Sequence, residues 1–133
     1  MSVAGRGLDS YRQTQAQSRT PLELVVLLYD GALRFLSAAR DAIERRDIPA
    51  RREALSRTFA IISELQSTLK IEEGGEFAAS LDELYGYANR RLLEAAAKND
   101  VAPVDEIHKV FAILRDAWSS IATPTAAGSE LHP

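Results

Sequence analysis

The sequence is poor in residues that carry out chemistry, with no cysteine, one tryptophan and two histidines among 133 residues. The absence of cysteine excludes disulfides, thiolate metal sites and cysteine catalysis. No stretch approaches the roughly 18 apolar residues of a membrane span, and the N-terminus lacks the apolar core of a secretory signal. We therefore expect a cytoplasmic protein without membrane insertion.

An excess of positive charge is also lacking. Lys and Arg number 16 against 19 Asp and Glu, which gives a formal net charge of −3. Nucleic-acid binding depends on Lys and Arg clustered on one face, so no nucleic-acid partner is expected. One basic cluster exists, at Arg45, Arg46, Arg51 and Arg52. We interpret it as solvated residues that flank a turn between two helices, with a phosphate site as the alternative.

Helical periodicity is abundant, and it is clearest over residues 20–46. Thr20 and Glu23 have the spacing of a capping box, and Pro21 suits the first helical position. Apolar residues then recur every three or four positions, as on a core-facing helix: Leu22, Val25, Tyr29, Leu33, Leu36 and Ile43. Leu24, Leu28 and Phe35 fall outside this stripe. The helix is therefore expected to touch several neighbours or a partner.

Three further helices are predicted, over about residues 49–69, 76–98 and 103–122, with a loop at Glu72–Gly75 before the second of them. Their inward stripes are Leu55, Phe59, Ile62, Leu65 and Leu69; Phe77, Leu81, Tyr85, Ala88, Leu92 and Ala96; and Ile107, Val110, Phe111, Leu114, Ala117, Trp118 and Ile121. Ile61 lies at the edge of its stripe, and Tyr87 lies on the far side of its helix.

These elements predict an all-α fold, because no strand pattern competes with them. Short connections favour an antiparallel up-down-up-down four-helix bundle over residues 20–122. The chain is too short for two ordinary domains. We expect residues 1–19 to form a mobile N-terminal arm and residues 123–133 a disordered tail.

The predicted bundle offers little for catalysis or metal binding. A di-iron bundle needs several inward Glu residues and two Glu-x-x-His motifs, whereas this chain has a single Asp105-x-x-His108. The carboxylates lie at polar angles or helix ends, and no cofactor motif is present. We expect neither metal nor cofactor nor enzymatic activity. Gly31, in the middle of the first helix, is interpreted as a point of close helix packing, with a direct partner contact as the alternative.

Two apolar residues stand out in the N-terminal arm. Leu8 and Tyr11 are three positions apart, so both can point the same way if a short helical turn forms. They are either anchors that lie on the bundle or incidental residues of a disordered tail, and the spacing leaves both interpretations open.

Six segments resemble, in order, the flagellin-specific secretion chaperone family FliS. They are Tyr11–Gln15 (YRQTQ), Leu27–Ala32 (LLYDGA), Ile61–Leu65 (IISEL), Gly74–Glu76 (GGE), Leu84–Leu92 (LYGYANRRL) and Ala117–Trp118. No single segment is decisive. Their order, gaps and placement on the predicted helices make the resemblance specific, and it covers the chain from about Leu8 to Trp118.

The resemblance implies a cytoplasmic four-helix bundle that binds the C-terminal segment of flagellin, prevents premature polymerisation and helps deliver it to the flagellar type III export gate. It also favours the anchor interpretation of Leu8 and Tyr11. A regulatory module that binds another flagellar protein, such as an anti-sigma factor, stays open as the alternative. The expected partner-binding residues are Leu8, Tyr11, Leu24, Leu28, Phe35, Ile61 and Ile113.

Overall fold

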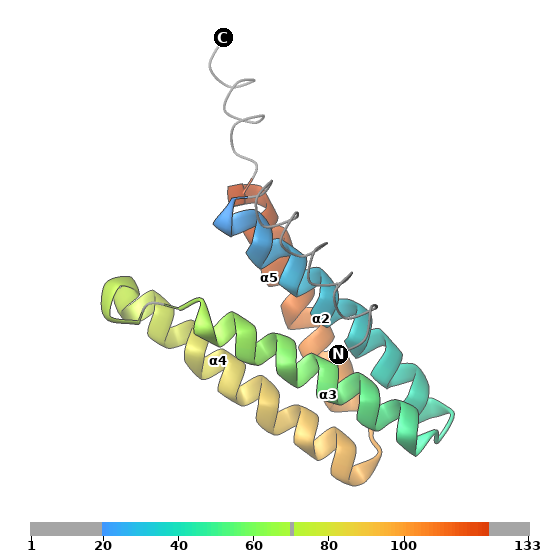
Figure 1. Cartoon of the computed structure of the whole chain (residues 1–133). Coiled ribbons are helices and arrows are strands. Elements are labelled where there is room, and N and C mark those ends of the chain that lie inside the picture. The colour runs from blue at the N-terminus through green and yellow to red at the C-terminus, as the bar shows by residue number, and fades with distance from the viewer. Residues whose placement is uncertain (1–19, 70, 123–133) are drawn as a thin grey trace, which may run out of the picture.

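The computed structural model describes residues 20–69 and 71–122, which form four helices (Figure 1). The helices are α2 (Pro21–Glu44), α3 (Ile48–Ser67), α4 (Ile71–Lys98) and α5 (Val101–Ala122). The described residues contain no strand. The predicted arm and tail, including Leu8 and Tyr11, lie outside this part of the chain.

The start of α2 has the predicted capping box. The Glu23 backbone N–H donates to Thr20 Oγ1 at 3.1 Å, and the Thr20 backbone N–H donates to Glu23 Oε1 at 2.9 Å. Two of the four amide groups that a helix leaves without intrahelical partners are thereby satisfied. The capping box fixes the first residue of α2, on which α3 and α5 pack.

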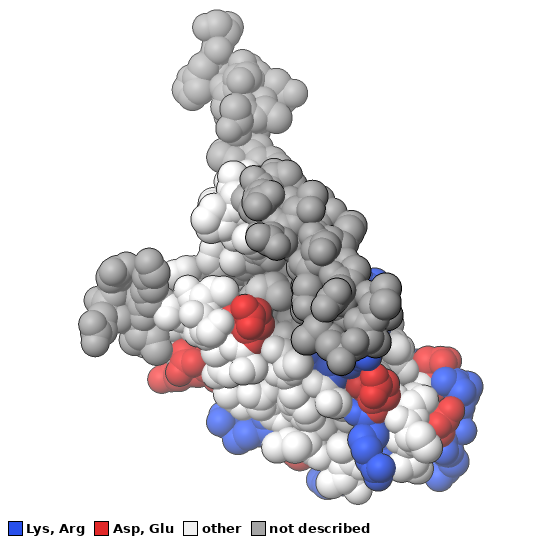
Figure 2. All heavy atoms as spheres, viewed as in Figure 1, with Lys and Arg blue, Asp and Glu red and all other residues white. Residues whose placement is uncertain are grey.

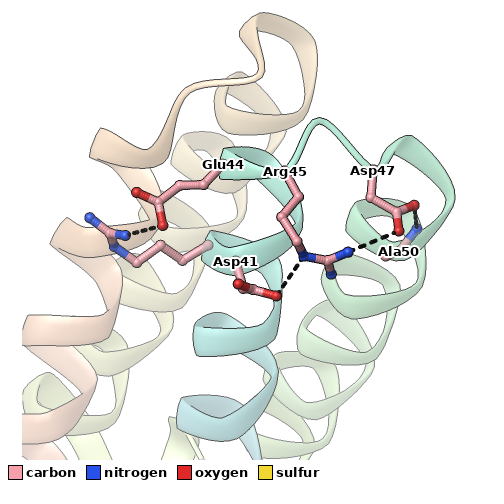
Figure 3. Close-up of polar contacts among 6 residues, drawn as sticks. Asp41, Glu44, Arg45, Asp47 and Ala50 are labelled. Carbon is pink, nitrogen blue, oxygen red and sulfur yellow. Dashed lines mark hydrogen bonds and ion pairs between the residues drawn. The ribbon is translucent and has the colours of Figure 1, made fainter.

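The turn between α2 and α3 is built from backbone geometry and local charge (Figure 3). Arg46 has a φ of 57°, and the Asp47 N–H bonds to the Ala42 carbonyl at 2.9 Å, the closing bond of a Schellman turn. Asp47 then caps α3 by accepting from the Ala50 N–H at 3.1 Å. Arg45 bridges Asp41 at 2.9 Å and Asp47 at 3.3 Å. The basic cluster flanks this turn, as expected.

The break before the third helix differs from the prediction. We expected a loop over Glu72–Gly75, but the helical assignment begins at Ile71 and only Gly75 departs from helical geometry, with φ 60° and ψ −137°. That backbone conformation favours glycine, because other residues meet a steric penalty there. A Cβ added to Gly74 would lie only 2.6 Å from the Ala78 Cβ, so Gly74 permits the close approach of the two turns.

The helices alternate in direction, as the prediction of an up-down-up-down bundle requires. Helix α2 packs on α3 along one flank and on α5 along the other, and α4 packs on α3 and α5. Figure 1 shows the α2 and α5 pair diverging from the α3 and α4 pair toward the end that holds Thr20, the α3–α4 connection and Ala122. The bundle is therefore tighter at the end that holds the α2–α3 and α4–α5 connections.

The core follows most of the predicted stripes. The largest fully buried side chains include Tyr29, Leu36, Ile62, Leu65, Tyr85, Leu92, Ile107 and Phe111. Three expected core positions were wrong: Phe77 is 64% exposed, Ile121 is 52% exposed, and Ala117 is also exposed. Phe77 and Ile121 lie near the diverging end, where neighbouring helices no longer cover an inward-facing side chain.

Candidate functional site

Four of the predicted partner-binding residues come together between α2 and α3. Leu24, Leu28 and Phe35 occupy a sector about 40° wide on α2 at 100° per residue, and all three are half-buried. Ile61, also half-buried, faces them from α3. We call Leu24, Leu28, Gly31, Phe35 and Ile61 the α2–α3 seam.

Gly31 is a point of close contact between the two helices of this seam. A Cβ added at Gly31 would lie 3.0 Å from Ile61 Cδ1, a contact that requires the isoleucine to move. The glycine therefore lets Ile61 sit directly against the backbone of α2. This geometry supports the close-packing interpretation of Gly31, on the side of α2 that also carries Leu24 and Leu28.

The two ends of the seam differ in their surroundings. The Arg57 guanidinium lies over the Phe35 ring, 5.8 Å from its centroid, while Arg57 Nε donates to Glu53 at 2.8 Å. At the end near Thr20, Leu27 is 37% exposed and follows Leu24 on the outer side of α2. Charge thus borders the Phe35 end, and apolar side chains border the end near Thr20.

The opposite flank of α2 is held to α5 by ion pairs. Arg115 Nε contacts Asp30 at 2.8 Å, and Arg40 Nε contacts Asp105 at 2.7 Å. These pairs explain why α2 carries an aspartate in its middle, where helix propensity disfavours it. They also place α5 on the flank away from Leu24 and Leu28, so that α5 does not cover the α2–α3 seam.

Ile113 does not belong to the same face as the other predicted residues. It follows buried Phe111 by two positions, so its side chain points about 200° around α5 from the core, and it is 62% exposed. Exposed Ala117 follows it one turn later on the outer side of α5, whereas Val110 is half-buried against the core. The predicted residues that the structure describes therefore divide between two faces of the bundle.

A polar network lies between α4 and α5, close to the outer side of α5. Glu106 accepts from Tyr87 Oη at 2.7 Å and from Arg91 Nε at 2.6 Å. The bonds from Arg91 and Tyr87 lower the pKa of Glu106, and the bond to Glu106 raises the pKa of Tyr87. The far-side placement of Tyr87 was confirmed. Its partner was missed, because the spacing within one helix does not reveal contacts across helices.

Sequence reasoning also misjudged two exposed side chains. Leu27 was assigned no role although it lies in the conspicuous LLYDGA segment, which was the available signal. Phe77 was assigned to the core, yet its ring lies at the edge of the structure, 6.1 Å from the Trp118 ring in an edge-on contact. Both residues add apolar surface at the diverging end.

The described residues offer no site with evident chemistry. Within residues 20–69 and 71–122, no group of three or more His, Cys, Asp and Glu side chains could hold a metal ion. A hollow of about 660 Å³ is lined mainly by polar groups such as Gln66, Asp82 and Arg90. A second, of about 270 Å³, includes Arg40, Asp105 and His108, of which Arg40 and Asp105 already pair with each other. In the same part of the chain, no helix is long and apolar enough to cross a bilayer.

Charge is unevenly distributed over the surface. Figure 2 shows a cluster of Lys, Arg, Asp and Glu side chains at the end that holds the α2–α3 turn, and further charged side chains spread over the part of the same face that α3 and α4 form.

The chain is similar to known proteins of one family along most of its length. The family model described as "Flagellar protein FliS" matches residues 4–125. The flagellar secretion chaperone FliS of Salmonella typhimurium is 37% identical over 129 residues, which covers 93% of this chain and 95% of that protein. The protein of the same name from Bacillus subtilis is 38% identical over 109 residues, covering 82% and 80% of the two chains. The one from Campylobacter jejuni is 37% identical over 113 residues, covering 85% and 88%.

The match extends over nearly the whole chain and includes every described helix. Relatives from three distant bacteria share more than a third of the aligned residues. The chain therefore belongs to the FliS family of flagellar secretion chaperones.

Proposed function

We propose that this protein is a cytoplasmic export chaperone that binds the C-terminal segment of flagellin. In this role it prevents premature polymerisation and assists delivery to the flagellar type III export apparatus. The relatives support the class of function, since they are named flagellar secretion chaperones. The observation that carries the binding step is the α2–α3 seam, where apolar residues of two helices remain half-buried next to exposed Leu27.

The seam suits a segment that folds as it binds. An amphipathic helix can lay its apolar face into a groove between two helices. A segment that is disordered before binding gains the burial of apolar surface and loses chain entropy in the same step. Leu24, Leu28 and Ile61 would supply the apolar contacts.

Ile113 extends the proposed client surface to a second face. A flagellin segment that contacts both Ile61 and Ile113 must pass around the bundle rather than lie in one straight groove. Leu8 and Tyr11 are proposed as further contacts, contributed by the arm that precedes Thr20. We therefore expect mutations on the two faces to disrupt separate parts of the contact with the client.

Calorimetric titration with flagellin and with flagellin lacking its C-terminal segment tests the proposal. The intact protein should bind with a negative heat-capacity change, because apolar surface is buried, and with weak salt dependence. The truncated protein should not bind. Equal binding of both flagellins would contradict the proposal, and binding of a flagellar regulator in place of flagellin would favour the regulatory alternative.

A further inference from the structure

An arginine without an ion-pair partner lies at the middle of the α2–α3 seam. Arg34 Nη2 lies 3.7 Å from the position that a Cβ of Gly31 would occupy, and Ile61 Cδ1 lies 3.0 Å from the same position. The guanidinium is therefore folded back over the glycine, beside the isoleucine. Arg34 is exposed, and it forms no ion pair within residues 20–69 and 71–122.

The carboxylate nearest to Arg34 along its own helix is engaged elsewhere. Asp30 precedes Arg34 by four positions, a spacing that permits an ion pair, but Asp30 accepts from Arg115 Nε at 2.8 Å. Four positions after Arg34 the helix carries Ala38, which has no charge. The positive charge of Arg34 therefore remains available to a binding partner.

A second arginine stands one turn further along the same seam. The Arg57 guanidinium carbon lies 5.8 Å from the centroid of the Phe35 ring, and its Nε donates to Glu53 at 2.8 Å. The Arg57 side chain is 58% exposed, and its two terminal NH2 groups make no hydrogen bond to the described residues. Because Phe35 follows Gly31 by four positions, the two guanidinium groups lie about one helical turn, roughly 6 Å, apart along α2.

We propose that Arg34 and Arg57 are specificity-determining residues that bind acidic side chains of the client helix in the α2–α3 seam. This inference rests on the proposed function, because it names the chemistry of the client at that site. The planar guanidinium presents paired N–H donors that match a carboxylate. Two acidic residues three or four positions apart on the client helix would match the one-turn spacing of the arginines.

The charge around the seam also gives the client a direction. Ile61 lies level with Gly31 on antiparallel helices, so Glu64, one turn later on α3, lies level with Leu28. Glu64 is exposed on the same side of Ile61 as Arg57, at 100° per residue. Negative charge therefore stands at the Leu28 end of the seam and positive charge at the other end. A client helix is favoured when its acidic residues face the arginines and its other end carries no acid.

The two ion pairs act mainly on the choice of client. Exposed ion pairs contribute little to affinity, typically below about 1 kcal/mol each, whereas the apolar residues of the seam supply the burial. A misplaced client loses more, because it leaves like charges side by side. The arginines thus select and orient a segment that apolar contact holds in place.

Calorimetric titration of the full chain with a peptide of the C-terminal segment of flagellin from the same genome tests the role of each arginine. Arg34→Glu should weaken binding by about tenfold, and Arg57→Gln by about threefold, because the first reverses a charge and the second removes one. The control is Arg90→Glu, which makes the same change in net charge at an exposed position of α4 and should leave the affinity within about twofold. Equal losses in Arg34→Glu and Arg90→Glu would overturn the inference, because the effect would then belong to net charge alone.

An exchange of charge between the partners gives the sharper test. Peptides in which each Asp or Glu is replaced by Lys, one at a time, should include one that binds the Arg34→Glu chain about tenfold more tightly than the unchanged peptide does. The same peptide should bind the wild-type chain more weakly, because it places two cations together. If no peptide restores the affinity, Arg34 does not contact an acidic residue of the client.

The two proposals fail in different ways. If the wild-type chain does not bind the peptide, the proposed function is wrong, and the inference that rests on it falls as well. If the wild-type chain and both arginine variants bind the peptide equally well, only the inference is wrong, because the apolar seam then accounts for binding without an ionic contact.

Discussion

The hydroxyl oxygens of Tyr29 and Tyr85 lie 2.6 Å apart in the centre of the bundle and join α2 to α4. Both residues are almost completely buried, at 0% and 1% exposure. The Phe111 ring packs against both, with centroid distances of 5.3 and 6.2 Å. Trp118 Nε1 is buried without a hydrogen-bond partner. Each of the two buried phenol groups therefore provides the hydrogen-bond partner of the other.

This pairing predicts non-additive effects on stability. Tyr29→Phe or Tyr85→Phe alone should cost about 1 to 2 kcal/mol, because the remaining hydroxyl is left buried without its partner. The double variant should cost less than the sum of the two, since no unpaired hydroxyl remains. Urea unfolding of the four proteins measures the coupling. Strict additivity would show that the two hydroxyls do not depend on each other.

The same pair predicts how stability responds to alkaline pH. Burial raises the pKa of both tyrosines above the ordinary value near 10, and for Tyr85 the bond to Tyr29 adds to the effect. The folded state therefore keeps both protons at a pH where the unfolded state releases them. Their contribution to stability is complete below pH 10 and is lost as the pH rises through the raised pKa values.

A combined titration checks this expectation. Tyrosinate absorbance and helical circular dichroism should be followed together as the pH is raised above 10. Tyr29 and Tyr85 should ionise only as helicity is lost. Ionisation of all four tyrosines with helicity unchanged would contradict the buried pair.

Gly31 gives a test of the packing at the α2–α3 seam. Alanine is favoured over glycine in a helix by about 1 kcal/mol, but its Cβ would lie 3.0 Å from Ile61 Cδ1. Gly31→Ala alone should therefore raise the free energy of unfolding little or not at all. In an Ile61→Val background, which removes that carbon, the same change should stabilise by up to about 1 kcal/mol. Equal effects in the two backgrounds would mean that Ile61 does not restrict this position.

The arm contributes a prediction that concerns binding alone. Leu8→Ala combined with Tyr11→Ala should weaken flagellin binding, because a tyrosine supplies a large rigid apolar contact with a polar tip. The melting temperature should stay unchanged, since neither residue belongs to a helix stripe. Titration with a C-terminal flagellin peptide measures the effect. Tighter binding would indicate a lid that competes with the client, and unchanged affinity would indicate a plain tail.

Local signals in the sequence predicted much of the fold. The capping box of Thr20 and Glu23 and the stripes through Leu36, Ile62 and Leu92 were confirmed, because they depend on residues a few positions apart. The packing role of Gly31 was also predicted, because glycine inside a helix is unfavourable unless it permits a close contact. Leu24, Leu28 and Phe35 share one side of α2, because periodicity reports the angle of a side chain around its own helix.

The sequence could not show which neighbouring helix packs against each side of a given helix. Asp30 pairs with Arg115, which lies 85 positions away in the sequence. The hydroxyl of Tyr29 pairs with that of Tyr85, which lies 56 positions away. The divergence of the helix pairs, which exposes Phe77, likewise depends on how four helices pack together. For the same reason the separation of Ile113 from the α2–α3 seam emerged only from the three-dimensional arrangement.

The most direct test of the account is the affinity of the C-terminal flagellin segment for a seam variant against a matched control. Leu24→Ser with Leu28→Ser removes two half-buried residues of the α2–α3 seam, and Leu93→Ser removes a residue that is 58% exposed elsewhere. Both variants replace only leucine side chains. Circular dichroism verifies that each variant stays folded. The account predicts that the seam variant binds at least about tenfold more weakly, a loss of about 1.4 kcal/mol, while the control binds as the wild type does. A folded seam variant with wild-type affinity would contradict it.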